Sequence, residues 1–551
     1  MNLYKYVSNA INKKLGFEAK LDVPKNREFG DFATNAAMVG AKIAGKNPRE
    51  LANEYVPLLK ELDFVADVSI AGPGFINIKI KDDFILQNAI APKQMIAEKP
   101  LKIDLDYAGY NVGKALHIGH LRTTIVGDTF NRIAKFVGHT TKSYNHIGDW
   151  GRPMGLVIAW ILEHGMPDTA EELNTFYPLS SARAKEDEAW MEHARQITAE
   201  LQAGNPEYRK IYDAFMKISL QQMDDVLVRL NVMPFDMTMG ERGVADYVAD
   251  TQKILESKHL LERDDGALIV NVKNDSDRAP MPPLMFRTSA DTQTYAAADL
   301  SAIYYRTKTD NPDVIGYFTD SRQSLHFNQV FRVAKMADIT HADLFHTGFG
   351  ALTGGDGKPF KTRDGGVANL TDILDTVENA VQERVAASNK QLDTDTINAI
   401  ALAAVKFNDL IHDVKSDYIF DPNAITSFEG KTGPYILYTA VRLNSVLKRA
   451  GASIEKPKSF ELSNEERNLL IEIMDFEKTV LAAYENRATD MIANYAYDLC
   501  QLTNNFYHNC PILRDDITPE TKAGRLYIAK MAFDTLSTAI DLMGLKIPNE
   551  M

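Results

Sequence analysis

Residues 101–138 read LKIDLDYAGYNVGKALHIGHLRTTIVGDTFNRIAKFVG, and this stretch decides the fold. The segment LKIDLDY has the apolar pattern of a buried strand, and the segment from Ile118 to Gly138 has helical spacing. A second strand, KSYNHIGDW, follows directly. Strand, helix and strand in this order favour an α/β fold with a parallel, doubly wound, Rossmann-like sheet. Ligands of such sheets bind at the carboxyl ends of the strands, so the loop before the helix is the first place to expect a site.

The start of that helix carries residues suited to holding phosphates. A helix N-terminus leaves backbone N–H groups unpaired and carries about half a positive charge, so phosphate binds there readily. His117 and His120 can add hydrogen bonds, and Gly119 would let an adenine ring or ribose lie close to the backbone. Lys114 adds a cation just upstream. The pattern predicts a nucleotide site formed by His117, Gly119 and His120; the alternative is a pair of surface histidines near a turn.

A second cationic cluster lies far downstream, in the segment GGDGKPFKTRDGG at residues 354–366. Its glycines predict a flexible loop, and Lys358, Lys361 and Arg363 predict an anionic target. Such a loop could close over a triphosphate and neutralise charge in the transition state. The alternative is a solvated basic hairpin. Together the two clusters predict nucleotidyl transfer by positioning and electrostatics, without a covalent enzyme intermediate.

The composition is that of a large acidic protein with several domains. A chain of 551 residues is too long for one hydrophobic core. The net charge of −14 argues against broad nucleic-acid affinity, so any RNA contact must use a local basic cluster. No run of about 18 apolar residues occurs, and we expect no membrane span. Cys500 and Cys510 match no zinc spacing, which predicts a reduced, cytoplasmic protein without a tightly bound metal.

The order of predicted elements divides the chain into four parts. Residues 1–95 alternate between helices and strands, which predicts a small α+β domain. Residues 96–370 would form the parallel-sheet domain, with a charged helical insertion at about 165–265. Within the same domain, GALIVNV, LMFRTS and DVIGYFTD are predicted strands. Residues 371–432 would form a helical stem, and residues 433–551 an all-α domain.

Long ordered stretches of the sequence resemble one known family. HIGH at His117–His120 and KPFKTR at Lys358–Arg363 are similar to the two signatures of class I aminoacyl-tRNA synthetases, the second in a degenerate form. The chain resembles most closely the arginyl-tRNA synthetases, through GDFATNAA and GPGFINIKI near the start, NHIGDWG after the first signature, and FEGKTGPYILYTAVRLNSVLKRA and RLYIAKMAFDTLSTAIDLMGLKIPNEM in the last third. The resemblance implies that the N-terminal domain contacts the tRNA elbow and that the C-terminal helices bind the anticodon. Two departures lie near the expected site: Gly109-Tyr110 replaces the usual Ser-Pro, and Arg152-Pro153-Met154 replaces Thr-Gln-Phe.

The predicted substrate can be tested against the chemistry of the residues. A guanidinium carries five N–H donors, so its pocket needs carboxylates and other acceptors. Tyr295 and Asp299 are four residues apart and share one helix face, where Asp299 could pair with the guanidinium. The alternative is an ordinary helix face with a capping aspartate. The resemblance adds Asp106 and Asn111 beside the amino and backbone groups of arginine, and Gln323 as a further contact.

A helix near residue 440 is the predicted RNA contact. Arg442, Lys448 and Arg449 lie along it near Tyr435 and Tyr438. Cations hold phosphates and aromatic rings stack on unpaired bases, so these five residues are the candidates for tRNA binding. The alternative is a core helix with solvated lysines.

The resemblance implies a complete reaction. Arginine would attack the α-phosphate of ATP, and the arginyl group would then pass to the 3′ end of tRNA(Arg). His117 and His120 would bind ATP, while Lys358, Lys361 and Lys114 would stabilise the reacting phosphate. Magnesium would accompany ATP, tRNA would be needed for the first step, and we expect a monomer.

Three alternatives remain open from the sequence. A small-molecule nucleotidyltransferase shares the logic of the first signature but has no use for the helical region at 370–551. A synthetase-like RNA-binding protein without catalysis is opposed by His117, His120 and Lys361. A class I synthetase for another amino acid is opposed by Tyr295, Asp299 and Gln323.

Overall fold

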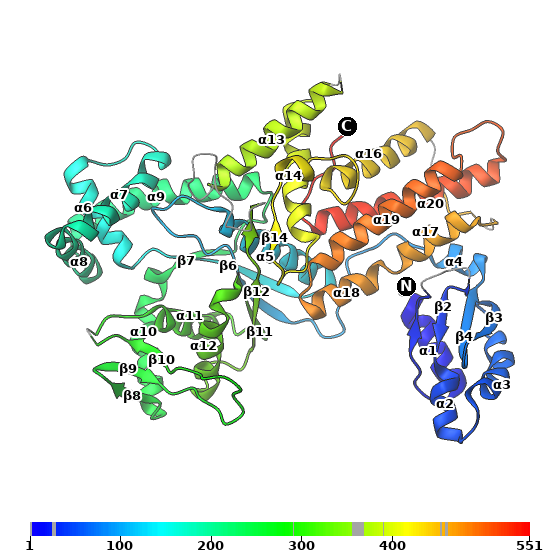
Figure 1. Ribbon diagram of the computed structural model, residues 1–551, viewed down its shortest axis with the longest axis horizontal. Coiled ribbons are helices and arrows are strands. Elements are labelled where there is room, and N and C mark those ends of the chain that lie inside the picture. The colour runs from blue at the N-terminus through cyan, green and yellow to red at the C-terminus, as the bar shows by residue number, and fades with distance from the viewer. Residues whose placement is uncertain are drawn as a thin grey trace.

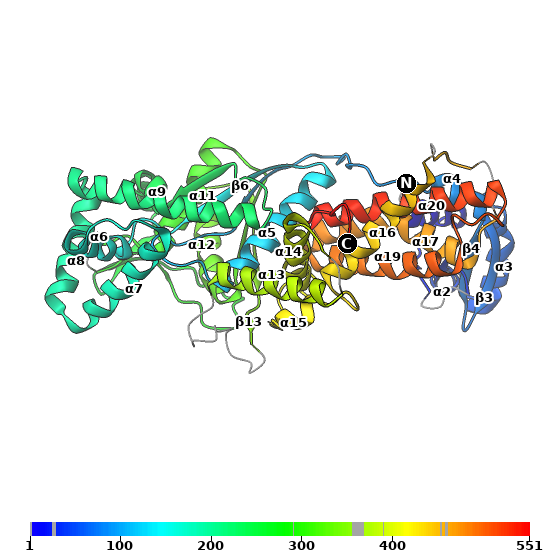
Figure 2. The ribbon, with the colours of Figure 1, turned by 90° about the horizontal axis from the view of Figure 1, so that it is seen from above.

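The molecule is elongated, with the N-terminal domain at one end of a helical body, and the five-stranded parallel sheet with its inserted lobes at the other (Figures 1 and 2). The computed structural model describes residues 3–24, 29–289, 291–354, 369–388, 391–451, 454–457 and 461–551. Among these residues, no helix is long and apolar enough to cross a membrane. Nor do they contain a group of three or more His, Cys, Asp or Glu side chains that could hold a metal ion. Cys500 and Cys510 are buried free thiols.

The five-stranded sheet, called the catalytic sheet below because it carries the candidate active site, is parallel throughout, as the strand–helix–strand order predicts. Its order is β12-β11-β5-β6-β7, with bounds Asp343–Phe349, Val314–Asp320, Lys102–Asp106, Thr140–Ile147 and Met237–Gly240. Strand β5 lies between β6 and β11, so the strand order reverses beside it. Loops on the two sides of such a reversal diverge and leave a crevice at the carboxyl ends of the strands.

Helix α5 (Ile118–Val137) follows β5 and is buried along most of its length. It ends at Gly138, whose φ of 103° places the C-cap in the left-handed region. Helices α13 (Leu370–Ala387), α14 (Thr394–Leu410) and α18 (Phe476–Asn486) pack against it. The helix that carries the first signature is therefore enclosed by the helical half of the molecule.

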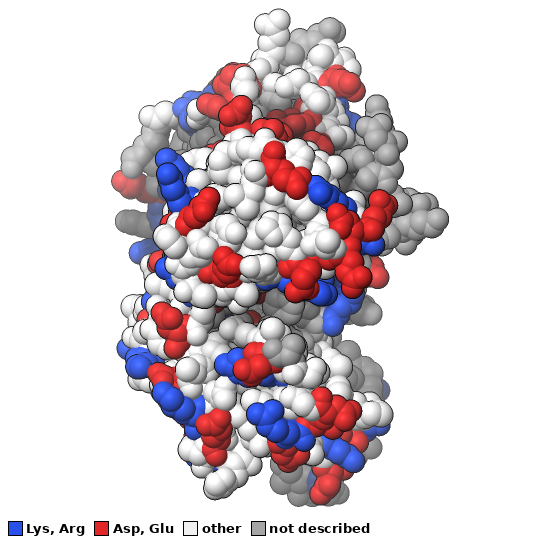
Figure 3. All heavy atoms as spheres, turned by 90° about the vertical axis from the view of Figure 1, so that its left-hand side faces the viewer, with Lys and Arg blue, Asp and Glu red and all other residues white. Residues whose placement is uncertain are grey.

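The region between β6 and β11 forms two lobes beside the sheet (Figure 1). One lobe is helical: α6 Arg152–His164, α7 Ala170–Glu186, α8 Glu188–Ala203 and α9 Pro206–Arg229. The stretch at about 165–265, predicted as a helical insertion, also contains β7, which pairs with β6 in the catalytic sheet. The other lobe contains an antiparallel sheet of β8 Leu261–Asp264, β9 Ala267–Val270 and β10 Leu284–Arg287, with helices α10 Glu241–Ser257, α11 Tyr295–Thr309 and α12 Ser324–Met336. On the face that these lobes turn outward, basic and acidic side chains are interspersed (Figure 3).

The stem and the C-terminal body are almost entirely helical. After α14 the chain forms β14 (Tyr418–Ile419), which pairs in parallel with β13 (Leu352–Thr353), and then α15 (Pro422–Ile425). The body consists of α16 Gly433–Ala450, α17 Asn464–Met474, α18, α19 Asp490–Asn509 and α20 Pro519–Leu542.

The N-terminal domain is a four-stranded antiparallel sheet with helices. Its elements are α1 Leu3–Leu15, β1 Leu21–Asp22, β2 Phe32–Thr34, α2 Ala36–Ala44, α3 Pro48–Lys60, β3 Val65–Ala71, β4 Phe75–Ile80 and α4 Asp82–Asn88, with strand order β1-β2-β4-β3. Buried Arg467 of α17 joins this domain to the helical body. Its guanidinium donates to the carboxylates of Asp31 and Asp82 and, at 2.7 Å, to the Ile80 carbonyl.

Candidate active site

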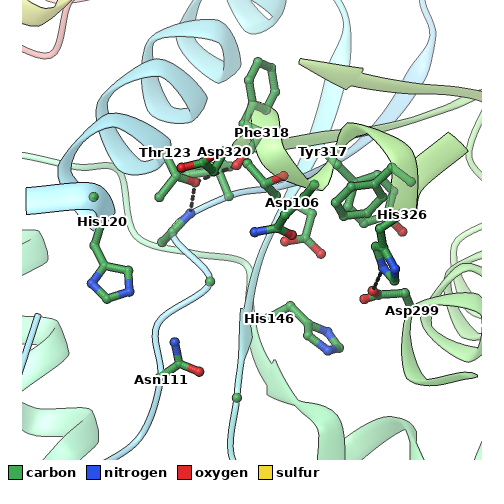
Figure 4. Close-up of a pocket in the computed structure, with 18 of the residues that line it drawn as sticks. Asp106, Asn111, His120, Thr123, His146, Asp299, Tyr317, Phe318, Asp320 and His326 are labelled. Carbon is green, nitrogen blue, oxygen red and sulfur yellow. Dashed lines mark hydrogen bonds and ion pairs between the residues drawn. The ribbon is translucent and has the colours of Figure 1, made fainter. Parts of the chain in front are cut away.

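A cavity of about 550 Å³ lies at the carboxyl ends of β5, β6 and β11, where the sheet topology predicts a site. The starts of α5, α10, α11 and α12 complete its wall (Figure 4). Its lining includes most of the residues proposed from the sequence for nucleotide and arginine binding, namely Asp106, Asn111, His117, Gly119, His120, Tyr295, Asp299 and Gln323. The fold thus brings together residues that are more than 200 positions apart in the chain.

The two histidines are built into the first turn of α5. His117 is the N-cap residue, and its Nδ1 accepts a hydrogen bond from the Gly119 N–H at 3.1 Å. The Nδ1 of His120 accepts from the His117 N–H at 3.1 Å, and the two rings stack with centroids 3.9 Å apart. Because Nδ1 accepts in both rings, the neutral imidazoles must carry their proton on Nε2. Both are therefore donors at the mouth of the helix, where phosphate is also favoured by the helix dipole.

Burial keeps these imidazoles neutral. It lowers the pKa of His120 to about 3, with smaller contributions from His117 and Lys114. The pKa of His117 is also lowered, again chiefly by burial and then by Lys114. Glycine at position 119 leaves room for a ribose or adenine, as predicted, and it also leaves room for the His117 ring. A Cβ at this position would lie 2.9 Å from Cε1 of His117. The pair acts through hydrogen bonds and contributes no net charge near neutral pH.

Of the cations predicted for the nucleotide site, only Lys114 lies in the described part of the chain. Lys114 does not line the cavity; its Nζ lies 4.5 Å from the centroid of the Tyr177 ring on α7. Lys358, Lys361 and Arg363 lie outside the described residues.

Among the described residues, four carboxylates line the cavity, and two of them already have guanidinium partners. Asp106 forms a buried ion pair with Arg306 of α11, and Asp320 pairs with Arg322 at 2.6 Å. Asp299 accepts no guanidinium in the described part of the chain; one of its oxygens lies 2.6 Å from Nε2 of His326 (Figure 4).

Glu241 is the fourth carboxylate, and sequence reasoning missed it. Burial raises its pKa to about 7, with further contributions from nearby Asp149 and Asp299. A buried carboxylate near a second one is destabilised until a cation arrives, so Glu241 and Asp299 are the pair available to a cationic ligand. Glu241 is the first residue of α10, directly after β7. A carboxylate directly after a strand of a parallel sheet was the signal that could have found it.

The remaining predicted contacts come from the loops at this edge. Asn111 lies in the loop after β5 and forms a parallel bridge with Gly148, which follows β6. A Cβ on Gly148 would lie 2.5 Å from Oδ1 of Asn111, so glycine is needed at that crossing. Gln323 is exposed at the end of the short 3₁₀ helix η2 (Ser321–Gln323), which connects β11 to α12. Tyr295 begins α11, one turn before Asp299.

The two departures from the resembled family have local explanations. Tyr110 is buried, shares a 2.7 Å hydrogen bond with Thr124 of α5, and lies edge-on to the ring of His120. The Tyr110 ring therefore packs against the imidazole of His120 and helps to hold it in place. Arg152 and Pro153 begin α6, where proline in the first turn suits a helix start. Neither Arg152 nor Pro153 lines the cavity.

The predicted RNA-binding residues lie along α16 in two settings. The hydroxyl of Tyr435 accepts from Gln501 and Asn504, so this ring is held by α19. Arg442 donates to the Tyr438 hydroxyl at 2.9 Å and lies over that ring. Lys448 and Arg449 are exposed in the last turn of the helix.

Comparison with protein families assigns three long segments of the chain. Residues 84–422 match the family described as tRNA synthetases class I (R), catalytic domain. Residues 436–551 match the DALR anticodon binding domain, and residues 1–80 match the arginyl tRNA synthetase N terminal domain. The parallel sheet, the paired histidines at the start of α5 and these matches define a class I aminoacyl-tRNA synthetase.

Individual relatives narrow this class to one family. The arginine–tRNA ligase of Alkaliphilus oremlandii is 35% identical, over 99% of this chain and 97% of its own length. That of Shewanella denitrificans is 36% identical, over 97% of this chain and 96% of its own. The chain therefore belongs to the arginyl-tRNA synthetase family.

Solved structures agree on the fold. The arginyl-tRNA synthetase of Plasmodium falciparum superposes with a TM-score of 0.82 at 23% identity, over 100% of this chain and 98% of that one. The Thermus thermophilus enzyme gives 0.80 at 21% identity, over all of both chains. At such identities the likeness concerns the fold alone.

Proposed function

We propose that this protein is an arginine–tRNA ligase that activates L-arginine with ATP and transfers it to the 3′ end of tRNA(Arg). The observation that carries the proposal is the position of two carboxylates, Asp299 and Glu241, which have no guanidinium partner among the described residues and lie in the same cavity as the His117–His120 pair. A planar cation and a nucleotide can then bind side by side. The arginine carboxylate attacks the α-phosphorus, pyrophosphate leaves, and a ribose hydroxyl of tRNA next displaces AMP from the adenylate.

The nucleotide half of the site would use hydrogen bonds first and cations second. The Nε2–H groups of His117 and His120 would donate to phosphate oxygens, with Gly119 allowing close approach of the ribose or adenine. Lys114 would have to leave the Tyr177 ring to reach the reacting phosphate. Lys358 and Lys361 are proposed to neutralise the same charge from the second signature. Magnesium would arrive bound to ATP.

The arginine half of the site would recognise its substrate by charge and by the placement of its hydrogen-bond acceptors. Asp299 and Glu241 would take the guanidinium, with Tyr295 and Gln323 as polar neighbours in the same lining. Asn111 and Asp106 would face the amino acid's backbone end. Asp106 is shared, because Arg306 holds one of its oxygens.

The remaining domains would bind tRNA. We propose that residues 1–95 contact its elbow, and that residues 433–551 bind the anticodon through Tyr435, Tyr438, Arg442, Lys448 and Arg449. Residues 96–370 would carry the chemistry and residues 371–432 would connect the two halves. We further propose that the enzyme acts as a monomer in the cytoplasm.

An aminoacylation screen with all twenty amino acids, ATP and total tRNA tests this function. Arginine should be the substrate with by far the highest rate. Arginine-dependent exchange between ATP and pyrophosphate should be weak until tRNA is added. Charging of another amino acid, or no charging at all, would disprove the proposal.

A further inference from the structure

We propose that Arg122 is a positioning residue for the reaction, which holds the histidine-bearing helix, the end of strand β12 and the stem in one register. This inference rests on the function proposed above. Arg122 follows His120 by two positions on α5, yet its side chain is 1% exposed and does not line the cavity. It does not touch the substrate site, so any effect must act through the elements that it joins.

The guanidinium joins three elements at once. Its Nη1 donates to the carbonyl of Gly350 at 2.8 Å and to that of Ser416 at 2.9 Å. Its Nε lies 3.3 Å from Oδ2 of Asp409 on α14. Gly350 directly follows β12, and Ser416 lies between α14 and β14. A planar group with several donors is suited to such a junction, because it can satisfy divergent acceptors from a fixed position.

The backbones meet at the same place. The N–H of Gly350 donates to the Val414 carbonyl at 3.0 Å, and that of Ala351 donates to Asp417 at 2.5 Å. A Cβ on Gly350 would lie 2.4 Å from the carbonyl of Ser416, so no side chain fits between the two segments. The parallel pairing of β13 with β14 continues the contact. The end of β12 and the stem thus form one unit, with Arg122 as its link to α5.

The charges at this junction are only partly satisfied. Tyr418, whose pKa burial raises well above its usual value, donates its hydroxyl proton to Asp409 at 2.8 Å. In the described part of the chain, Nη2 of Arg122 and Oδ1 of Asp409 have no hydrogen-bond partner. An apolar cluster of similar volume would serve stability as well or better. Compared with an apolar cluster, the guanidinium therefore contributes orientation rather than stability, because its hydrogen bonds set where α5 lies relative to β12 and the stem.

The stem also reaches the histidine cap from the other side. The N–H of Leu370, the first residue of α13, donates to the Leu116 carbonyl at 2.7 Å, and Asn369 bridges His117. The first turn of α5 is therefore held by the stem both before His117 and just after His120. Helix α14 packs on α16, which carries the proposed anticodon contacts. The same helix thus touches both halves of the enzyme, and a shift of about 1 Å at the imidazoles is enough to slow a positioned reaction greatly.

A second buried pair between the same two helices provides a matched control. Lys406 of α14 is fully buried, lies 3.7 Å from Asp128 of α5, and donates to the carbonyls of Leu230 and Gly544. It lies farther along α5 from the histidines and does not contact the end of β12. Asp128 keeps Arg132 as a partner when Lys406 is removed, just as Asp409 keeps Tyr418 when Arg122 is removed.

The test compares Arg122→Met, Arg122→Lys and Lys406→Met in the full-length enzyme, by pyrophosphate exchange at saturating tRNA and by thermal unfolding. Arg122→Met should lower kcat roughly 10- to 100-fold while KM for arginine stays unchanged, because the carboxylate half of the site is built on other elements. Arg122→Lys should recover part of the loss. Lys406→Met should leave both kinetic constants unchanged, whatever it does to the unfolding midpoint. If Arg122→Met does not fold, Asp409→Asn and Tyr418→Phe report on the same junction and should lower kcat in the same selective way.

Equal kinetic effects of Arg122→Met and Lys406→Met would overturn the inference and leave only a general packing role. An unchanged kcat in soluble Arg122→Met, or in Asp409→Asn and Tyr418→Phe where that protein does not fold, would overturn it too. A failure of the proposed function is recognised separately, because the unsubstituted enzyme would then not charge tRNA with arginine.

Discussion

Replacing Asp299 by Asn should reduce kcat/KM for arginine by roughly 30- to 150-fold. Breaking a fully buried ion pair on one side costs about 3–5 kcal/mol. The Asp299 side chain is 22% exposed, and Glu241 remains as a second carboxylate, so we discount this to about 2–3 kcal/mol. At about 1.4 kcal/mol for each factor of ten, the stated range follows.

Steady-state aminoacylation with arginine and with citrulline measures this effect. Citrulline has nearly the same shape as arginine but carries no charge, so Asp299→Asn should lower the preference for arginine over citrulline as well as the rate. KM for ATP should stay unchanged, because the nucleotide half of the site is built on α5. Asp250→Asn on the neighbouring helix α10 is the control: that carboxylate pairs with Lys253 at 3.4 Å and does not line the cavity.

The reasoning would be refuted by an Asp299→Asn enzyme whose kcat/KM for arginine matches that of Asp250→Asn. It would also be refuted by equal losses with arginine and citrulline, since these would indicate a defect of packing rather than of charge recognition.

Four further predictions concern separate parts of the enzyme. His120→Asn should lower kcat by roughly 10²–10³ in pyrophosphate exchange, because a phosphate donor is lost, whereas exposed His164→Asn should have no effect. Burial raises the pKa of Glu241 to about 7, so its charged fraction falls as the pH drops through that value. KM for arginine should therefore increase when the pH is lowered from about 8 to about 6. Glu241→Gln should raise KM and abolish this pH dependence. Arg467→Met should lower the free energy of unfolding in urea by about 3–5 kcal/mol, because it leaves the buried carboxylate of Asp31 without its guanidinium partner at the N-terminal interface; an unchanged transition would contradict this. Lys448→Ala should weaken tRNA binding and reduce the slope of log affinity against log salt by about 1, and an unchanged slope would exclude a phosphate contact.

The local parts of the fold were predictable from the sequence, and the pairing of distant elements was not. Strand β5 and helix α5 were confirmed because their apolar periodicity and the glycine at the helix end are strong local signals. GALIVNV and LMFRTS were correctly predicted as strands, but β9 pairs with both β8 and β10 in a separate antiparallel sheet, whereas β11 joins the catalytic one. Strand propensity does not specify a partner, because pairing depends on residues far away in the chain.

The candidate site divides in the same way. His117 and His120 are close in sequence, so their joint role follows from one helix start. The ion pair of Asp106 with Arg306 spans 200 positions, and an arginine inside a helix pattern gives no sign of where it points. Glu241 lies outside the motifs that carry the family resemblance, so none of those motifs marks it as a site residue. That Asp299 can accept a cationic ligand becomes clear only in the structure, where Asp106 and Asp320 already pair with Arg306 and Arg322.

The capping arrangement of the two imidazoles limits how this enzyme can hold its products. Each ring has committed one nitrogen to the backbone of its own helix, so taking up a proton there would loosen the turn that positions it. A permanently neutral pair grips pyrophosphate weakly compared with a fixed pair of cations. Fast departure of the leaving group would then be an inherent property of the helix start, and inhibition by added pyrophosphate should depend on Lys114 and the lysines of the second signature rather than on the histidines.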